Sequence, residues 1–156
     1  MIAFVAGDLL ASGETYIAQG VAEGNQEGLG TGLAFKISRR WPDVQVAFKK
    51  YARSGRFTGG DIWTLAPAPD RPGFVYMATQ PDMYHATMPY LRKAVRKLAQ
   101  WADRHGVVSV ALPKIGAGLG KLSWDDDVKP LLVEHLTPGP THFVIYETFR
   151  NEFEVE

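Results

Sequence analysis

Two glycine-rich segments are the parts of this sequence whose residue types and spacing favour chemistry. Residues 20–32 read GVAEGNQEGLGTG, and residues 113–120 read PKIGAGLG. Glycines let the backbone approach a ligand closely, and consecutive backbone N–H groups can together bind phosphate oxygens. Two such segments in one short chain predict a ligand that carries phosphate.

Neither segment matches a common nucleotide-binding motif. A P-loop needs a Gly-Lys-Ser/Thr sequence, which this chain lacks. Gly116-Ala-Gly118-Leu-Gly120 has the spacing of a dinucleotide fingerprint, but it follows a late strand. No acidic residue ends a following strand about 20 residues later, where ribose recognition would need one. We therefore expect neither a P-loop nor a Rossmann site.

The elements around these segments indicate an α/β protein. Short apolar runs alternate with amphipathic helical patterns, and each glycine-rich segment follows a predicted strand. In open α/β sheets, ligands bind at the carboxyl ends of the strands, so both segments are expected at that edge. The predicted strands are 2–6, 15–21, 61–66, 73–79, 107–112 and 141–148. The predicted helices are 33–40, one that Asp43 caps and Gly55 ends, 88–105, and 127–136.

Composition narrows the class of protein. Seventeen Lys and Arg balance seventeen Asp and Glu among 156 residues, so the chain as a whole lacks the basic excess of a general nucleic-acid binder. A local basic face stays possible. The chain has no cysteine, which excludes thiol nucleophiles and thiolate metal sites and fits a cytoplasmic protein. We expect no signal peptide and no membrane span.

We also expect no metal and no cofactor. The four histidines are scattered, and Asp125 to Asp127 begin a predicted helix, where acidic residues complement the helix dipole. Trp101 and Trp124 are interpreted as packing residues. The basic side of the 88–105 helix is interpreted as its solvated face, with a contact surface for nucleic acid as the alternative; it comprises Arg92, Lys93, Arg96 and Lys97.

Four short motifs together resemble the macrodomain family, and most closely its terminal ADP-ribose protein glycohydrolase type. They are Gly7-Asp-Leu-Leu10, Gly28-Leu-Gly-Thr-Gly-Leu-Ala34, Pro113-Lys-Ile-Gly-Ala-Gly-Leu-Gly-Lys-Leu-Ser-Trp124 and Phe143-Val-Ile-Tyr146. Their order and spacing cover nearly the whole chain. The resemblance implies one macrodomain over residues 1–156, with a three-layer α/β/α fold and a mixed sheet of about six strands.

The resemblance also implies which residues bind ADP-ribose. Asp8 matches the aspartate that accepts a hydrogen bond from the adenine amino group, with Leu9 adding a backbone contact beside it. Tyr146 borders the adenine pocket. The loop around the distal ribose corresponds to Gly30, Thr31 and Gly32. The loop whose amides hold the diphosphate corresponds to Ile115, Gly116, Ala117, Gly118 and Leu119.

The catalytic positions differ from those of the hydrolases that the chain most resembles. The lysine and the aspartate of those enzymes correspond here to Gln80 and Gly120. Three groups become the catalytic candidates: Gln80, Asn25 and Glu27, of which Gln80 is expected to orient water. His85 and Asp125 also lie near the loops. Asn25 and Glu27 could equally be solvated loop residues, His85 a helix-capping residue, and Asp8 the cap of a short helix.

The expected function is hydrolysis of mono-ADP-ribose from modified acidic side chains of proteins. The expected partners are ADP-ribose and ADP-ribosylated proteins, rather than nucleic acid or membrane. Three alternatives remain open: a reader that binds ADP-ribose without cleaving it, a phosphatase on ADP-ribose 1″-phosphate, and a hydrolase of ADP-ribosylated DNA.

Overall fold

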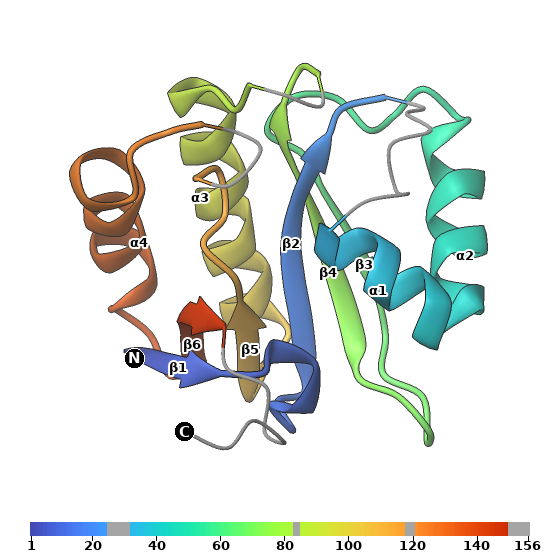
Figure 1. Ribbon diagram of the computed structural model, residues 1–156, viewed down its shortest axis with the longest axis horizontal. Helices are drawn as coiled ribbons and strands as arrows, with labels where there is room; N and C mark the ends of the chain where they lie inside the picture. Colours follow the sequence, from blue (N-terminus) through green and yellow to red (C-terminus); the bar gives the residue numbers. More distant parts are fainter. Residues whose placement is uncertain (25–31, 83–84, 118–120, 150–156) are drawn as a thin grey trace.

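The computed structural model describes residues 1–24, 32–82, 85–117 and 121–149. Six strands form one mixed sheet in the order β1-β6-β5-β2-β4-β3, in which β3 runs antiparallel and the other five run parallel (Figure 1). The strands are β1 Ile2–Gly7, β2 Tyr16–Ala22, β3 Ile62–Leu65, β4 Gly73–Gln80, β5 Ser109–Leu112 and β6 His142–Phe149. The six-strand mixed sheet expected from the resemblance is confirmed.

Helices cover both faces of this sheet. α1 (Gly32–Arg40) and α2 (Pro42–Ala52) pack on one face, while α3 (Met88–Arg104) and α4 (Lys129–Leu136) pack on the other (Figure 1). A short 3-10 helix, η1 (Leu9–Ala11), follows β1, and a π-helical turn, η2 (Trp124–Val128), leads into α4. The layers confirm the α/β/α architecture. None of the helices in the described ranges is long and apolar enough to cross a membrane.

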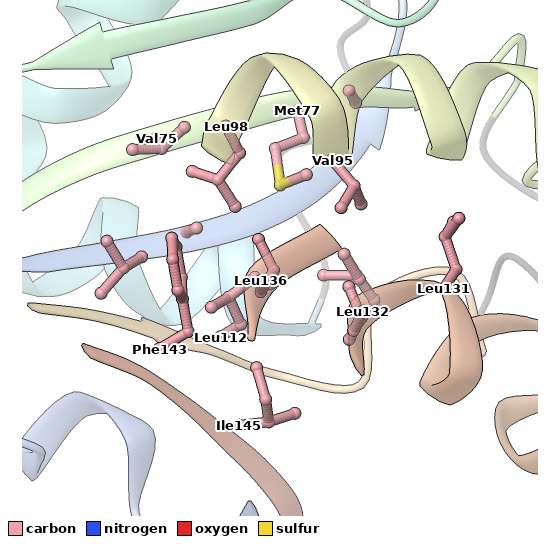
Figure 2. Close-up of a cluster of buried hydrophobic side chains, with 14 of the residues drawn as sticks. Val75, Met77, Val95, Leu98, Leu112, Leu131, Leu132, Leu136, Phe143 and Ile145 are labelled. Carbon is pink, nitrogen blue, oxygen red and sulfur yellow. The ribbon is translucent and has the colours of Figure 1, made fainter. Parts of the chain in front are cut away.

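The hydrophobic cluster between the sheet and α3–α4 is built from alternate residues of the strands and one stripe of each helix (Figure 2). Leu98 of α3 and Leu132 of α4 are fully buried against Met77 and Leu112 of the sheet. Truncating a leucine in such a core to alanine typically costs about 2–5 kcal/mol. Trp124 belongs to this cluster as well, which confirms its interpretation as a packing residue.

The second cluster, beneath α1 and α2, is rich in aromatic side chains. Phe48 of α2 packs edge-on against Phe57, Trp63 and Tyr76, with ring centroids 4.7–5.2 Å apart. Such arrangements add to the stabilisation that burial alone provides. This cluster holds α1, and with it the end of the first glycine-rich segment, against the sheet.

Both helices whose starts were predicted at aspartates begin elsewhere. α2 starts at Pro42, so Asp43 lies inside the first turn rather than at the cap. Proline suits the first helical position because its φ angle is preset and no N–H is lost there. The carboxylate of Asp43 instead pairs with Arg71 Nε at 2.9 Å.

The last helical segment starts at Trp124, not near Asp127. Ser123 caps it, because Ser123 Oγ accepts a hydrogen bond from the Asp126 amide, and Asp127 Oδ2 accepts one from the Ser123 amide. These two hydrogen bonds cap the helical segment at Ser123, four residues before the predicted start at Asp127. The helical segment therefore begins earlier than the sequence predicted. β5 is also shorter than predicted, beginning at Ser109, and all four of its residues are buried.

Candidate functional site

The carboxyl ends of the five parallel strands lie along one edge of the sheet. Asp8 follows β1 there, Glu23 follows β2, Gln80 ends β4, and Pro113 follows β5. This is the edge where open α/β sheets bind ligands. Several of the residues singled out in the sequence are therefore brought to one region by the topology.

Asp8 and Leu9, which directly follow β1, lie near Tyr146 in the middle of β6. A Cβ atom placed on Gly7 would lie 3.2 Å from Tyr146 Cε2, so the tyrosine ring lies directly against the backbone beside Asp8. Leu9 and Tyr146 contribute to the same hydrophobic cluster. The residues after β1 and the strand β6 thus form one candidate subsite with a carboxylate and an aromatic ring.

Asp8 also performs the capping role that was its alternative interpretation. Its Oδ1 accepts a hydrogen bond from the Leu10 amide at 3.1 Å, and this bond caps η1. A carboxylate has two oxygens and about four acceptor directions, so capping leaves acceptor capacity for a ligand amino group.

The pKa of Tyr146 agrees with the short distance between Tyr146 and Asp8. Burial raises the pKa of the Tyr146 hydroxyl, and the negative charges of Glu14 and Asp8 raise it further, while a hydrogen bond with Ser12 acts in the opposite direction. The hydroxyl therefore stays protonated at neutral pH and can donate a hydrogen bond.

Gln80 lies where the ends of β2 and β4 are joined. The Glu23 amide donates to the Gln80 carbonyl oxygen at 2.8 Å, and Gln80 Nε2 donates to the Asp82 carbonyl oxygen at 2.7 Å. Only 8% of Gln80 is exposed. The fixed Nε2 orients the side-chain amide, whose oxygen remains a hydrogen-bond acceptor. This arrangement suits a residue that orients water rather than one that transfers a proton.

Glu23 is a residue of this edge that the sequence analysis did not select. Its Oε2 accepts a hydrogen bond from the Gly59 amide at 2.7 Å, and its Oε1 accepts one from the Tyr90 hydroxyl at 3.1 Å. The Glu23 hydrogen bond raises the pKa of Tyr90. A polar residue directly after a buried strand was the signal that could have identified it. Both oxygens are engaged, so Glu23 holds the end of β2 in place.

The described part of the second glycine-rich segment is a tight turn packed on the start of α3. Gly116 has a φ of +76°, which favours glycine, and a Cβ atom there would meet Leu122 at 3.3 Å. The amides of Ile115 and Ala117 donate to the carbonyl oxygens of Pro113 and Lys114. Ile115 is buried, so its side chain anchors the turn.

Several sequence-predicted site residues lie outside the described residues: Asn25, Glu27, Gly30, Thr31, Gly118, Leu119 and Gly120. Gly32 is described, as the exposed first residue of α1 with a φ of +59°. The first glycine-rich segment therefore joins the carboxyl end of β2 to the start of α1.

The two secondary candidates have surface roles in the structure. The His85 amide donates to Asp82 Oδ1 at 2.9 Å, and the His85 side chain is exposed. Asp125 is exposed in the first turn of η2, near its N-terminus. Throughout the described ranges, no three acidic or histidine side chains gather closely enough to hold a metal ion.

A separate surface hollow lies at the amino ends of β2 and β4. It is lined by the 10–15 loop, by Arg40 and Trp41, and by the loop before β4. None of the sequence-predicted site residues lines it. We therefore assign the candidate site to the carboxyl edge, where the predicted residues converge.

Comparisons with known proteins agree with the fold. The chain is 30% identical over 140 residues to a DNA ADP-ribosyl glycohydrolase of Thermus aquaticus, which covers 87% of this chain and 38% of that protein. It is 27% identical over 127 residues to the human ADP-ribose glycohydrolase OARD1, covering 80% of this chain and 78% of that protein. The chain thus spans little more than a third of the bacterial relative.

Solved structures show the same fold. The macrodomain of Mycobacterium tuberculosis DarG superposes with a TM-score of 0.83 at 25% identity, covering 94% of this chain and 97% of that one. Thermosipho africanus DarTG, solved in complex with ADP-ribose, has the same TM-score at 22% identity and covers 99% of this chain and 43% of that one.

A family model described as "Macro domain" matches residues 24–130, which is more than half of the chain. That range includes residues 24–32 of the first glycine-rich segment, the whole of the second, and the ends of β4 and β5. The chain belongs to the Macro domain family.

Proposed function

We propose that this protein binds ADP-ribose at the carboxyl edge of its sheet and hydrolyses the bond between the distal ribose and a carrier macromolecule. The observation that carries the proposal is the convergence of Asp8 and Tyr146 beside Gly7, because the family resemblance assigns both residues to the adenine end of the ligand. The names of the relatives, two kinds of ADP-ribosyl glycohydrolase, support cleavage as well as binding.

ADP-ribose would lie along the edge from β1 toward β4. Asp8 would accept a hydrogen bond from the adenine amino group, and the Gly116 amide would face the diphosphate. Gly30, Thr31 and Gly32 would surround the distal ribose. Backbone amides bind a diphosphate without a cluster of lysines. Such recognition is compatible with a protein whose net charge is zero.

Hydrolysis would consume one water molecule. For an ester to a glutamate or aspartate side chain, water adds across the ester bond and releases ADP-ribose with a free hydroxyl and the carrier with a free carboxyl group. Gln80 would orient this water through its amide oxygen, because its Nε2 is fixed by the Asp82 carbonyl. A neutral amide does not take up a proton at neutral pH, so Gln80 acts by positioning. Asn25 and Glu27 remain the candidates for proton transfer.

Two carriers are proposed. Acidic side chains of proteins were the expectation from the sequence. ADP-ribosylated DNA is the second candidate, since the bacterial relatives are named DNA ADP-ribosyl glycohydrolases. A cytoplasmic location is proposed as well, because a chain without cysteine has no need of an oxidising compartment.

The decisive experiment is a release assay with three substrates: a protein with glutamate-linked ADP-ribose, an ADP-ribosylated oligonucleotide, and ADP-ribose 1″-phosphate. We expect free ADP-ribose from one of the first two. Gln80→Ala should slow release by about 10-fold or more while binding of free ADP-ribose is retained. Binding without release from any substrate would make the protein a reader. Unchanged turnover in Gln80→Ala would remove Gln80 from the mechanism.

A further inference from the structure

The charge of this neutral chain is concentrated in one layer of the fold. Residues 32–56 form α1, α2 and the turn that follows, and they contain seven basic residues and one acidic residue, a net charge of +6. The rest of the chain therefore carries −6. The basic residues of this layer are Lys36, Arg39, Arg40, Lys49, Lys50, Arg53 and Arg56.

These side chains lie on the side of the layer that faces away from the sheet. α2 buries Val44, Phe48 and Ala52 against the sheet, so Lys50 and Arg53 project from the opposite side of the helix and are exposed. α1 buries Ala34 and Ile37 and exposes its basic residues in the same way. We call this exposed surface of α1, α2 and the following turn the basic face.

Three of these basic side chains have no carboxylate partner in the part of the chain that the structure describes. Asp43, the acidic residue of the layer, already pairs with Arg71 from the loop before β4. Across the described ranges, Lys50, Arg53 and Arg56 form no ion pair with a carboxylate. α3 on the opposite layer differs, because Lys93 and Lys97 both pair with Asp61. The basic face is therefore the surface with the larger uncompensated positive charge.

Aromatic side chains lie among the arginines of α1. The Arg39 guanidinium is 5.6 Å from the ring centroid of Phe35, which is 42% exposed, and the Arg40 guanidinium is 4.6 Å from that of Trp41. Guanidinium groups bind phosphates, and exposed aromatic rings stack with bases. An anionic membrane would also attract positive charge, but a membrane-bound helix needs a free apolar face. The apolar faces of α1 and α2 are buried in the core.

We propose that the basic face binds the phosphate backbone of a nucleic acid. α1 begins at Gly32, a residue assigned above to the distal ribose, so a nucleic acid on this face could carry the ADP-ribose that enters the site. In that sense the inference rests on the proposed function, since it selects nucleic acid as the carrier. The binding itself needs no ADP-ribose and can be measured alone.

The test is fluorescence anisotropy with an unmodified, labelled 20-nucleotide single-stranded DNA. If about four phosphates are neutralised, each contributing ~0.7 to the slope of log affinity against log salt, affinity should fall by about 50-fold between 50 and 200 mM salt. The double variant Lys50→Glu/Arg53→Glu should bind at least about 10-fold more weakly than wild type. Its urea midpoint and its affinity for free ADP-ribose should be unchanged.

The matched control is Arg92→Glu/Arg96→Glu, which makes the same charge change on exposed positions of α3. It should bind the oligonucleotide nearly as wild type does. Equal losses in both variants would show that only net charge matters and would overturn the proposal. Absence of binding at 50 mM salt, or binding to anionic vesicles with none to DNA, would overturn it too. Because the DNA is unmodified, a failure of hydrolysis would leave this result intact.

Discussion

The Tyr90 hydroxyl of α3 donates a hydrogen bond to the carboxylate of Glu23, 67 residues earlier in the chain and directly after β2, at 3.1 Å. The other oxygen of the same carboxylate accepts a hydrogen bond from the Gly59 amide. Glu23 therefore ties together the end of β2, the loop before β3 and the first turn of α3. Glu23 belongs to the first glycine-rich segment, so these hydrogen bonds anchor the described beginning of that segment.

Removing this junction should destabilise the protein and weaken ligand binding together. Glu23→Ala leaves the Gly59 N–H without its acceptor, and we expect a loss of about 1–3 kcal/mol in the free energy of unfolding, measured in urea. Glu23→Gln retains an acceptor for Gly59 and should lose less. If the two variants were equally stable as wild type, the carboxylate would have no structural role.

The same contact predicts a pH dependence. The hydrogen bond to Glu23 raises the pKa of Tyr90 in the folded protein. A raised pKa contributes stability below the unfolded pKa of about 10, and this contribution is lost as the pH rises through the folded value. Tyr90→Phe should therefore be less stable than wild type at pH 7, and the difference should shrink above about pH 10. A constant difference from pH 7 to 11 would contradict this.

The lowered pKa of Asp61 predicts that the stability of the protein depends on pH in the acidic range. Burial acts to raise the pKa of its carboxyl group, but the hydrogen bonds from Lys97 and Thr58 outweigh burial and lower it. A lowered pKa contributes stability above the unfolded value, which is lost as the pH falls through the folded one. Asp61→Asn should be about 1 kcal/mol less stable than wild type at pH 7. The two proteins should converge near pH 2–3 in urea unfolding.

Asp8 has two roles that a pair of variants separates. Asp8→Ala removes the cap of η1, whereas Asp8→Ser keeps a capping oxygen but withdraws the carboxylate. Both should weaken ADP-ribose binding by about 10-fold or more in a calorimetric titration, because a hydrogen bond to a charged group is worth about 1.5–3 kcal/mol. Asp8→Ala alone should also lose about 1 kcal/mol of stability. Wild-type affinity in Asp8→Ser would limit Asp8 to capping.

Gly20 in β2 predicts a specific steric coupling with Thr79 in β4. A Cβ atom on Gly20 would lie 2.6 Å from Thr79 Oγ1, a buried hydroxyl with no hydrogen-bond partner. Gly20→Ala should therefore destabilise the protein by about 1–3 kcal/mol. Adding Thr79→Ala should recover most of that loss, because it removes the clashing Oγ1 and Cγ2 atoms of Thr79. It also removes the buried hydroxyl that has no hydrogen-bond partner. A double variant as unstable as the single one would contradict the coupling.

The order of strands and helices could be predicted from the sequence because it depends on local patterns. Short apolar runs predicted all six strands, and the predicted helix 88–105 agrees with α3 to within one residue at its end. Errors arose at the boundaries of α2 and the last helical segment, where Pro42 and the reciprocal caps of Ser123 and Asp127 overrode the nearest aspartates. The glycine-rich segments could also be predicted as ligand-binding loops, because many glycines close together are typical of loops in which the backbone approaches a ligand.

Contacts between distant parts of the chain were decided by the tertiary structure alone. Tyr146 meets Asp8 because β1 and β6 pair in parallel, and Glu23 finds Tyr90 because α3 packs beside the ends of β2 and β4. The sequence left a local basic face possible, and residues 32–56 already carry a net +6, but only the packing of α1 and α2 decides that these charges lie on an exposed face. The net charge of the whole chain does not describe the charge of one surface, because a binding partner contacts only the side chains that are exposed on that surface.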